Sequence, residues 1–519
     1  MKCIISIFLI VFYSGITFSQ IVDVKKYTLT IYLGDASNEI TVAEKINFEV
    51  LQSGIDPVFE LVQLKNNGTG MKVDSILQQG GILDFNHKND SIHIAIKSFE
   101  TNQELTIYYH GIPQDGLIIG QNKYGERTFF GDNWPNRAHH WIACIDHPSD
   151  KAQIEFFVSA PKKYEVIANG EFVSIDSSNQ TNNTYHYNSK IELPTKVMVI
   201  GVADFKMRQF ESVGNIPVSG WVYKNQASKA LYDLEIAPDV LEFFINYIGS
   251  YPYEKLANVQ STTRYGGMEN AGCIFYDEDA LNGNRSSELL IAHEIAHQWF
   301  GNSATEEDWE HIWLSEGFAT YFANLYLENT KGEKTFQNQM ESDRQRVLSF
   351  NKNFKTPLVD QNYKDLEDLL NPNSYQKGAW VLHMLRYQIG DSLFKESIRK
   401  YYSDFKLGNA NTKDLQTVIE QVTGYDWTEF FNQWVYSEGH PKIRVEAKIS
   451  NSKILFDLKQ NGKKFDFPLT IKLNLINGET EFVELNVSEI KQSFSFPTNA
   501  KVKNYVIDPN INLLFELEK

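Results

Sequence analysis

The chain has little cysteine, no excess of positive charge and, beyond its first twenty residues, no long apolar run. Three cysteines occur in 519 residues, too few for a disulfide framework. The 49 Lys and Arg residues against 66 Asp and Glu leave a net charge of −17, which argues against nucleic acid or an anionic membrane as partner. No later stretch approaches the roughly 18 apolar residues that a membrane-spanning helix needs. Internal repeats and low-complexity segments are also lacking.

The N-terminus has a different character. Lys2 precedes a mostly apolar run that ends at Tyr13, and small residues then offer a cleavage point before Gln20. This pattern indicates a signal peptide at residues 1–19. We therefore expect an exported protein, periplasmic or secreted, that does not insert into the membrane after signal cleavage. An uncleaved membrane anchor is the alternative.

The two cysteines outside this segment are Cys144 and Cys273. Export would permit a bridge between them, but nothing in the sequence requires one, so whether they pair is left open. We expect two buried thiols and no cysteine at a metal.

The length is too great for one compact core and indicates several domains. Residues 20–205 contain alternating β-prone runs, such as residues 26–33 and 105–109, separated by Asn- and Gly-rich turns. Such alternation predicts an antiparallel β domain.

Helical patterns take over after this region. They begin near Asn225, and residues 227–249 read as one amphipathic helix within a mixed domain at residues 206–440. Alternation returns in residues 441–519, with turns at Asn-Gly pairs, and predicts a small β-sandwich. The expected fold class is multidomain α+β.

One short motif carries most of the chemical information. His293 and His297 flank Glu294 in an H-E-x-x-H pattern within an apolar segment. A helix brings positions i and i+4 to one face, so the two histidines can share a zinc ion while Glu294 faces the water at that ion. A chance match, with both histidines simply packed on a helix, is the alternative. Possible helix boundaries are marked by Ser286, Ser287, Gly301 and Asn302.

A second helical pattern supplies the missing metal ligand. It starts near Trp313 and runs to about Glu328, with Glu316 one turn inside. Catalytic zinc takes three protein ligands, commonly two histidines and one carboxylate, and keeps a fourth position open. Glu316 completes such a set if the two helices pack together. The alternative is a solvated glutamate favoured by the helix dipole.

Taken together, these motifs resemble the gluzincin aminopeptidases, the family that contains aminopeptidase N and leukotriene hydrolase. Eighteen residues separate His297 from Glu316 in W-L-S-E-G-F-A, as in that family. G-G-M-E-N at residues 266–270 and S-Y-Q-K-G at residues 374–378 match two further family motifs, in the family's order. The resemblance implies a saddle-like N-terminal β domain, a thermolysin-like catalytic domain, and one zinc ion held by His293, His297 and Glu316.

The resemblance also implies roles at the substrate. Glu269 would grip the free α-ammonium group of a peptide, because a charge-assisted hydrogen bond to an ammonium is strong when partly desolvated. Glu294 would be the general base, and Tyr375 would stabilise the oxyanion. The G-G-M-E-N segment also implies a backbone edge for an extended peptide. Its expected substrate-binding residues are Gly266, Gly267, Met268, Glu269 and Asn270.

Two points depart from the family or stay open. Relatives place a Gln or Glu of the N-terminal domain beside the substrate amine, but here that position falls near Asn133 or Trp134, which leaves the second amine contact in doubt. His139 and His140 lie nearby and receive no role. Many relatives also continue into a helical domain over the active site. The sequence shows no such segment, so we expect a more open cleft.

The predicted function is a zinc-dependent aminopeptidase acting on peptides with a free N-terminus. An endopeptidase is the first alternative, and Glu269 argues against it. Lipid epoxide hydrolysis and a metal-free peptide-binding module rank lower, the latter because every expected ligand and catalytic group is present. The preferred first residue, the physiological substrate and the oligomeric state are left open, and a monomer is compatible with the sequence.

Overall fold

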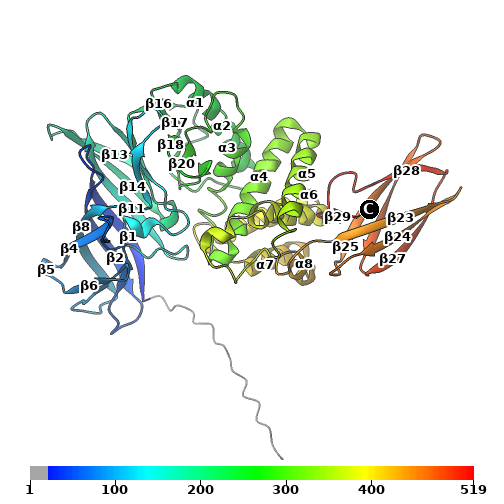
Figure 1. Ribbon diagram of the computed structural model, residues 1–519, viewed down its shortest axis with the longest axis horizontal. Helices are drawn as coiled ribbons and strands as arrows, with labels where there is room; N and C mark the ends of the chain where they lie inside the picture. The colour runs from blue at the N-terminus through cyan, green and yellow to red at the C-terminus, as the bar shows by residue number, and fades with distance from the viewer. Residues whose placement is uncertain (1–20, 519) are drawn as a thin grey trace, which may run out of the picture.

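The computed structural model describes residues 21–518, so the expected signal peptide at residues 1–19 lies outside the described part. The molecule is elongated, with a β-rich N-terminal part, a helical middle part and a strand-rich C-terminal part in chain order (Figure 1). This arrangement confirms the predicted multidomain α+β class. The domain boundaries expected at 205/206 and 440/441 stay predictions. Strand β16 begins at Phe205 and β23 at Lys442.

The N-terminal part is built on an eight-stranded sheet in the order β13-β14-β11-β1-β2-β8-β4-β5. The pairing of β1 with β11 is parallel, and the other pairs are antiparallel. In β1 and β8 buried side chains alternate with partly buried or exposed ones along most of the strand, because one face of the sheet packs on the core. The strands are β1 (Val22–Tyr32), β2 (Ile40–Val50), β4 (Gly70–Gln78), β5 (Gly81–Ile82), β8 (Asn102–Ile112), β11 (Lys151–Pro161), β13 (Glu171–Asp176) and β14 (Asn182–Pro194).

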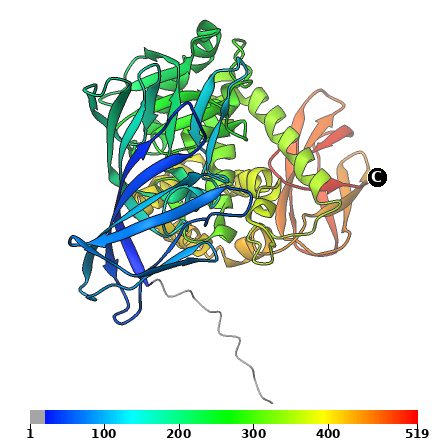
Figure 2. The same ribbon diagram turned by 60° about the vertical axis from the view of Figure 1, so that its left-hand side comes forward.

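Two smaller sheets complete this part, in the orders β3-β7-β6 and β12-β15-β10-β9. The turned view brings the N-terminal strands, coloured blue to cyan, forward (Figure 2). The two smaller sheets consist of β3 (Val58–Glu60), β6 (Phe85–Lys88), β7 (Ser91–Ile94), β9 (Leu117–Gln121), β10 (Arg127–Gly131), β12 (Glu165–Ala168) and β15 (Ile200–Ala203). The loop after β10 leads toward the middle part and carries Trp134.

The middle part opens with a five-stranded sheet in the order β16-β17-β18-β20-β19. Its last strand, β19, is an edge strand of two residues that pairs antiparallel with β20. The G-G-M-E-N segment therefore lies at a sheet edge, where the family resemblance implies it. The strands are β16 (Phe205–Gln209), β17 (Val218–Tyr223), β18 (Leu256–Ser261), β19 (Gly267–Met268) and β20 (Cys273–Asp277). A two-stranded pair joins β21 (Thr305–Glu306) to β22 (Asn409–Ala410).

Helices form the rest of the middle part. Two of them, α3 and α4, pack directly against each other, and α4 also packs on α5 and α6. Trp299, Trp313, Phe318 and Phe322 are fully buried in this region. The helices are α1 (Ala227–Leu234), α2 (Ala237–Tyr247), α3 (Glu288–Ala296), α4 (Trp313–Lys331), α5 (Glu333–Phe350), α6 (Gly378–Phe405, interrupted at Gly390), α7 (Thr412–Thr423) and α8 (Thr428–Trp434).

The prediction of a single helix over residues 227–249 is wrong. The structure has two helices there, α1 and α2, separated at Glu235 and Ile236. Pro238 is the physical reason, because proline lacks an N–H and fits only in the first turn of a helix. It stands in the first turn of α2.

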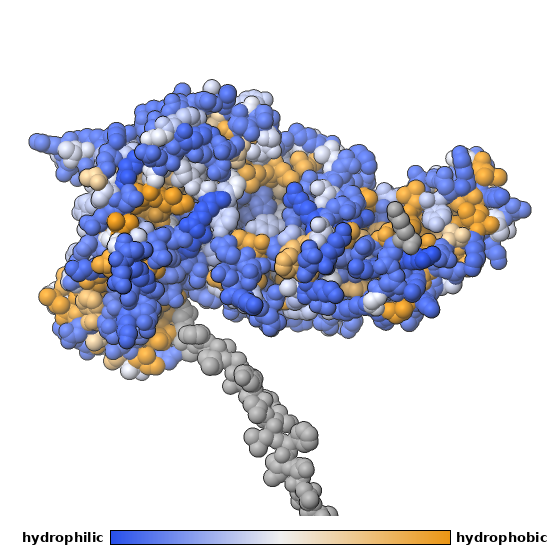
Figure 3. Space-filling view, in the orientation of Figure 1, coloured by the Kyte–Doolittle hydropathy of each residue, from blue (hydrophilic) through white to orange (hydrophobic). Residues whose placement is uncertain are grey.

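The C-terminal part is a sandwich of two mainly antiparallel sheets, as predicted. Their orders are β27-β24-β23-β29, where β23 and β29 pair in parallel, and β26-β25-β28. Apolar side chains stand on its surface, including Ile476 and Phe482, within an otherwise mostly hydrophilic exterior (Figure 3). The strands are β23 (Lys442–Ile449), β24 (Lys453–Gln460), β25 (Phe467–Leu475), β26 (Thr480–Val487), β27 (Lys491–Pro497), β28 (Val502–Ile507) and β29 (Glu516–Leu517).

Both described cysteines are buried and free. Cys144 and Cys273 form no disulfide within residues 21–518, and neither occurs in a group of possible metal ligands there. Across the same residues, no helix combines the length and the apolar content that crossing a membrane requires.

Candidate active site

The H-E-x-x-H motif lies on α3, whose last turn presents both histidines to the same side. The helix ends at Ala296, with His297 as its C-terminal cap, so the predicted stop at Gly301 is four residues too late. Ser287 stands at the N-cap position as expected, but its hydroxyl donates to the carbonyl oxygen of Ala280 rather than capping the helix. The spacing of the motif therefore predicted correctly that both histidines share one face of the helix. It predicted the ends of the helix only approximately.

Three ligand atoms from α3 and α4 meet at one point. The Nε2 atoms of His293 and His297 lie 3.0 Å apart. Glu316 Oε2 lies 3.3 Å from His293 Nε2 and 3.2 Å from His297 Nε2. Glu316 is buried in the first turns of α4, so the packing of α4 on α3 delivers its carboxylate to the histidines.

This triangle fits a tetrahedral zinc ion. Ligand atoms bound at about 2.0–2.1 Å with tetrahedral angles stand roughly 3.3 Å apart. Glu316 Oε2 is buried, and its contacts with the two histidine Nε2 atoms place three ligand-type atoms around one point, where a bound cation would offset the cost of burying them. His297 Nδ1 lies 3.2 Å from the carbonyl oxygen of Phe300 and 3.0 Å from Ser315 Oγ. A proton on Nδ1 that is held there leaves Nε2 free for a metal.

Glu294 lies beside this group and owes its place to a glycine. A β-carbon added at Gly267 would lie 2.3 Å from Glu294 Oε1, so only glycine leaves room for the carboxylate. Burial is the main cause that raises the pKa of Glu294 well above its usual value, and the neighbouring Glu269 and Glu316 raise it further. A carboxyl group with a raised pKa is suited to accept and return a proton near neutral pH.

Glu269 comes from the loop after β19 and is almost completely buried. Its backbone carbonyl oxygen accepts hydrogen bonds from Gln298 Nε2 and Asn302 Nδ2, which fix the loop to the end of α3. Its Oε1 atom has no partner within the described chain. Burial raises the pKa of this carboxyl group, and Glu316 adds to the effect. A cationic group placed against Oε1 would satisfy it.

Tyr375 stands on the other side of the metal ligands. It lies in a single π-helical turn, Asn373–Lys377, which leads directly into α6. Its ring stacks on that of His293 with 6.0 Å between the centroids and 15° between the planes. Single π turns occur often at functional sites. Burial keeps the pKa of the phenol well above its usual value, so the hydroxyl stays a hydrogen-bond donor.

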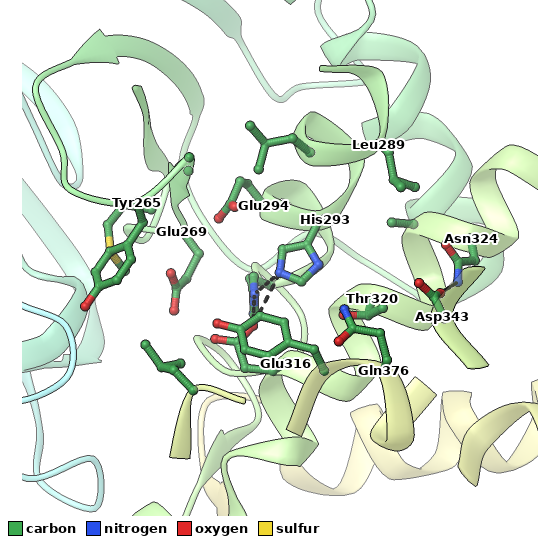
Figure 4. Close-up of a pocket in the computed structure, with 18 of the residues that line it drawn as sticks. Tyr265, Glu269, Leu289, His293, Glu294, Glu316, Thr320, Asn324, Asp343 and Gln376 are labelled. Atoms are coloured by element: carbon green, nitrogen blue, oxygen red, sulfur yellow. Dashed lines mark hydrogen bonds and ion pairs between the residues drawn. The ribbon is translucent and has the colours of Figure 1, made fainter. Parts of the chain in front are cut away.

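These side chains line one cavity of about 420 Å³. Figure 4 shows Tyr265 and Glu269 on one side of His293 and Asn324 and Asp343 on the other. Gly266, Gly267 and Met268 also line it, whereas Asn270 is fully buried and is not among the lining residues. The assignment of Asn270 to substrate binding therefore stays a prediction.

The N-terminal domain contributes Trp134 to this cavity. Asn133 is fully buried, and its amide donates to the carbonyl oxygens of Thr195 and Met198 and accepts from Trp141. The sequence left Asn133 and Trp134 open for a second amine contact. The side chain of Asn133 is fully engaged in hydrogen bonds within the fold. Trp134 carries an indole, which has no acceptor for an ammonium group.

A second group of possible ligands, Glu60, His139 and Asp146, lies in the N-terminal part. Asp146 already accepts from the backbone N–H of His139, from Thr195 Oγ1, and from His139 Nδ1 at 2.8 Å. These contacts explain the histidine pair by a structural role, without a metal ion.

Sequence reasoning missed several residues around the site. Ser315 and Gln298 support His297 and Glu269, and both stand next to the motifs without being part of them. Asn324 and Asp343 line the far end of the cavity from α4 and α5. A short motif gives no signal for these, because they reach the site only through helix packing.

Comparison with known families agrees with this geometry. Residues 25–197 match the peptidase M1 N-terminal domain, and residues 232–434 match the peptidase family M1 domain, which together cover most of the chain. The chain belongs to peptidase family M1. This is the family of the aminopeptidase N type, and it is zinc-dependent, so the resemblance seen in the sequence is confirmed. The M1 domain match contains His293, Glu294, His297, Glu316 and Tyr375.

Named relatives are similar at low identity. A probable aminopeptidase 2 of Sulfurisphaera tokodaii is 26% identical over 82% of this chain and 57% of its own length. Tricorn protease-interacting factor F2 of Thermoplasma acidophilum is 28% identical over 79% of this chain and 54% of its own. A leucyl aminopeptidase of Saccharolobus solfataricus is 26% identical over the same shares. The chain thus spans little more than half the length of these relatives.

Proposed function

We propose that this M1 family member is a zinc-dependent aminopeptidase that removes the first residue of peptides with a free N-terminus. His293, His297 and Glu316 hold one zinc ion per chain. When bound, the ion polarises the peptide carbonyl and makes water a stronger nucleophile at neutral pH. The observation that carries the proposal is the buried, unpartnered Oε1 of Glu269 beside this triad.

Each remaining step falls to a side chain of the chain itself. Glu269 accepts hydrogen bonds from the α-ammonium group and so fixes the end of the peptide. Glu294 takes a proton from the attacking water and returns it to the nitrogen of the leaving amine. Tyr375 donates a hydrogen bond to the oxygen that becomes negatively charged in the tetrahedral intermediate. The peptide backbone extends along the edge strand β19.

The charge around the cavity supports a cationic peptide end. Glu269, Glu294 and Glu316 are three buried carboxylates close to His297. One divalent ion and one ammonium group would together balance these charges, which buried groups require. An endopeptidase binds no free amine and would gain nothing from Glu269.

Two measurements test the proposal. Aminoacyl-naphthylamides and their N-acetylated forms are assayed before and after zinc removal. We expect hydrolysis of the free-amine forms alone, loss of activity with chelator and recovery with added zinc. Equal cleavage of the acetylated forms would favour an endopeptidase, and activity that survives zinc removal would contradict the metal role.

A Glu269→Gln variant then isolates amine recognition. It keeps the size of the side chain but removes the charge, so we expect kcat/KM on free-amine substrates to fall about a hundredfold, since charge-assisted hydrogen bonds are worth roughly 1.5–3 kcal/mol. Zinc content, measured by mass spectrometry, is the control and stays near one ion per chain.

For location, we propose export with removal of residues 1–19. The support is the charged and apolar pattern of those residues. Mapping the N-terminus of the protein isolated from its source cells tests this, and an intact N-terminus in the cytoplasmic fraction would contradict it.

A further inference from the structure

The cavity continues past the metal ligands to an end that the proposed reaction leaves unexplained. In Figure 4, Glu269 and Glu294 lie on one side of His293, while Asn324 and Asp343 lie on the other. In the proposed reaction, Glu269 holds the amine of the peptide and the ligand triad holds the scissile carbonyl. The residue after the scissile bond would then point toward Asn324 and Asp343.

This far end is rich in hydrogen-bond acceptors. Asn324 Nδ2 donates to Asp343 Oδ2 at 2.9 Å, and Gln339 Nε2 donates to Asp343 Oδ1 at 3.1 Å. Because the amide nitrogen of Asn324 faces a carboxylate, its oxygen must face away. That oxygen is buried and has no partner in the part of the chain that the structure describes. Asn324 and Asp343 are both 1% exposed, so water does little to satisfy them.

Donors are scarce at the same place. Arg346 is the one cationic side chain that lines the cavity among residues 21–518. It is exposed and forms no ion pair with Asp343 within those residues, although its charge contributes to lowering the pKa of that carboxyl group. An exposed guanidinium is screened by water and leaves the acceptors of Asn324 and Asp343 available.

The cavity between the triad and these acceptors has apolar and uncharged polar walls. Leu289, Leu290 and Ala323 line it, and Thr320 and Gln376 lie between Glu316 and Asp343 (Figure 4). Uncharged walls that lead to a floor of acceptors match a long side chain with a methylene stem and a cationic tip. An acidic side chain would meet Asp343 and the unpartnered oxygen of Asn324 unfavourably.

We propose that Asn324 and Asp343 form the floor of a subsite for the second residue of the peptide, and that this subsite selects lysine or arginine there. The inference rests on the proposed aminopeptidase function and adds the class of peptide that the same site prefers. The competing explanation is that the Asn324–Asp343 contact only ties α4 to α5.

The test compares peptides that differ only in the second residue. Leu-Xaa-Gly substrates carry lysine, norleucine or glutamate at Xaa, and release of leucine gives kcat/KM. Norleucine has the stem of lysine without the charge. For the wild-type protein we expect lysine to exceed norleucine about tenfold, and glutamate to fall below both, since a hydrogen bond to a charged group is worth roughly 1.5–3 kcal/mol.

Two variants test whether the preference for lysine depends on Asp343. Asp343→Asn is expected to bring the ratio of lysine to norleucine to within about twofold, because an amide keeps the shape but not the charge. Glu341→Gln removes the same charge from the same helix outside this cavity and is expected to leave the ratio as in the wild type. Peptide affinities measured by calorimetry in a Glu294→Gln background give the same comparison without turnover.

The outcomes separate the two proposals. If the wild-type protein hydrolyses leucyl-naphthylamide, which has no second residue, but treats the lysine and norleucine peptides equally, the subsite is overturned and the aminopeptidase function stands. The subsite also falls if Asp343→Asn lowers all three peptides by one factor, which is the result of a structural tie. If no free-amine substrate is cleaved, both the proposed function and the subsite that rests on it are contradicted. The wild-type ratio decides the matter even where Asp343→Asn folds poorly.

Discussion

Gly317 and Gly378 are in direct contact, and a β-carbon on either would lie 2.8 Å from the α-carbon of the other. Gly317 follows the proposed metal ligand Glu316 on α4, and Gly378 begins α6 after the turn that carries Tyr375. The two motif glycines thus let the backbones approach closely enough to bring Glu316 and the proposed oxyanion donor Tyr375 to the same cavity.

Gly317→Ala should therefore disturb the site as well as the fold. Alanine favours a helix over glycine, but the added methyl group meets backbone that has no room for it, and overpacking of this kind costs about 1–3 kcal/mol. We expect a lower free energy of unfolding in urea and reduced zinc content. Gly120→Ala is the matched control, because a β-carbon there meets nothing within 4 Å. Equal effects of the two variants would argue against the close contact.

Tyr375→Phe tests the oxyanion donor. The ring that stacks on His293 is kept and only the hydroxyl is lost, so we expect kcat to fall about 10²–10³-fold with little change in KM. Steady-state kinetics on an aminoacyl-naphthylamide measure both constants. Turnover near that of the wild type would remove Tyr375 from the reaction.

Glu294→Gln tests the general base. An amide cannot accept the proton, so we expect kcat to fall by about 10²–10⁴ while zinc stays bound, since Glu294 is not one of the three ligand residues. Glu288→Gln, at the start of the same helix, is the control and should keep most of the activity. Loss of zinc from Glu294→Gln would show that the residue holds the metal site together instead.

The pH dependence of substrate preference tests the second-residue subsite. Burial raises the pKa of Asp343 to about 6, while Asn324, Arg346 and Gln339 lower it by smaller amounts. The carboxyl group is therefore neutral at pH 5 and charged at pH 7.5. We expect the ratio of kcat/KM for lysine over norleucine peptides to rise across this range, with a midpoint near 6. Effects of pH on catalysis itself cancel in the ratio, and a ratio that stays flat or falls would contradict the assignment.

Much of the site could be predicted because its signals are local. His293 and His297 share a face by helix geometry, and Glu294 is fixed between them. The ends of α3 were less predictable, since caps depend on single hydrogen bonds such as that of Ser287, whereas the break between α1 and α2 had a local signal in Pro238. The register of the edge strand β19 depends on its pairing with β20, which no short motif encodes.

The sequence by itself determined the candidate set of metal ligands and the class of fold, because spacing along one helix and alternation along strands depend only on neighbouring residues. Only the tertiary structure decided what surrounds the ligands. It placed Trp134 of the N-terminal part at the cavity and brought Asp343 of α5 to its far end. Such contacts join residues far apart in the chain, and they arise from how helices and sheets pack rather than from any periodic pattern.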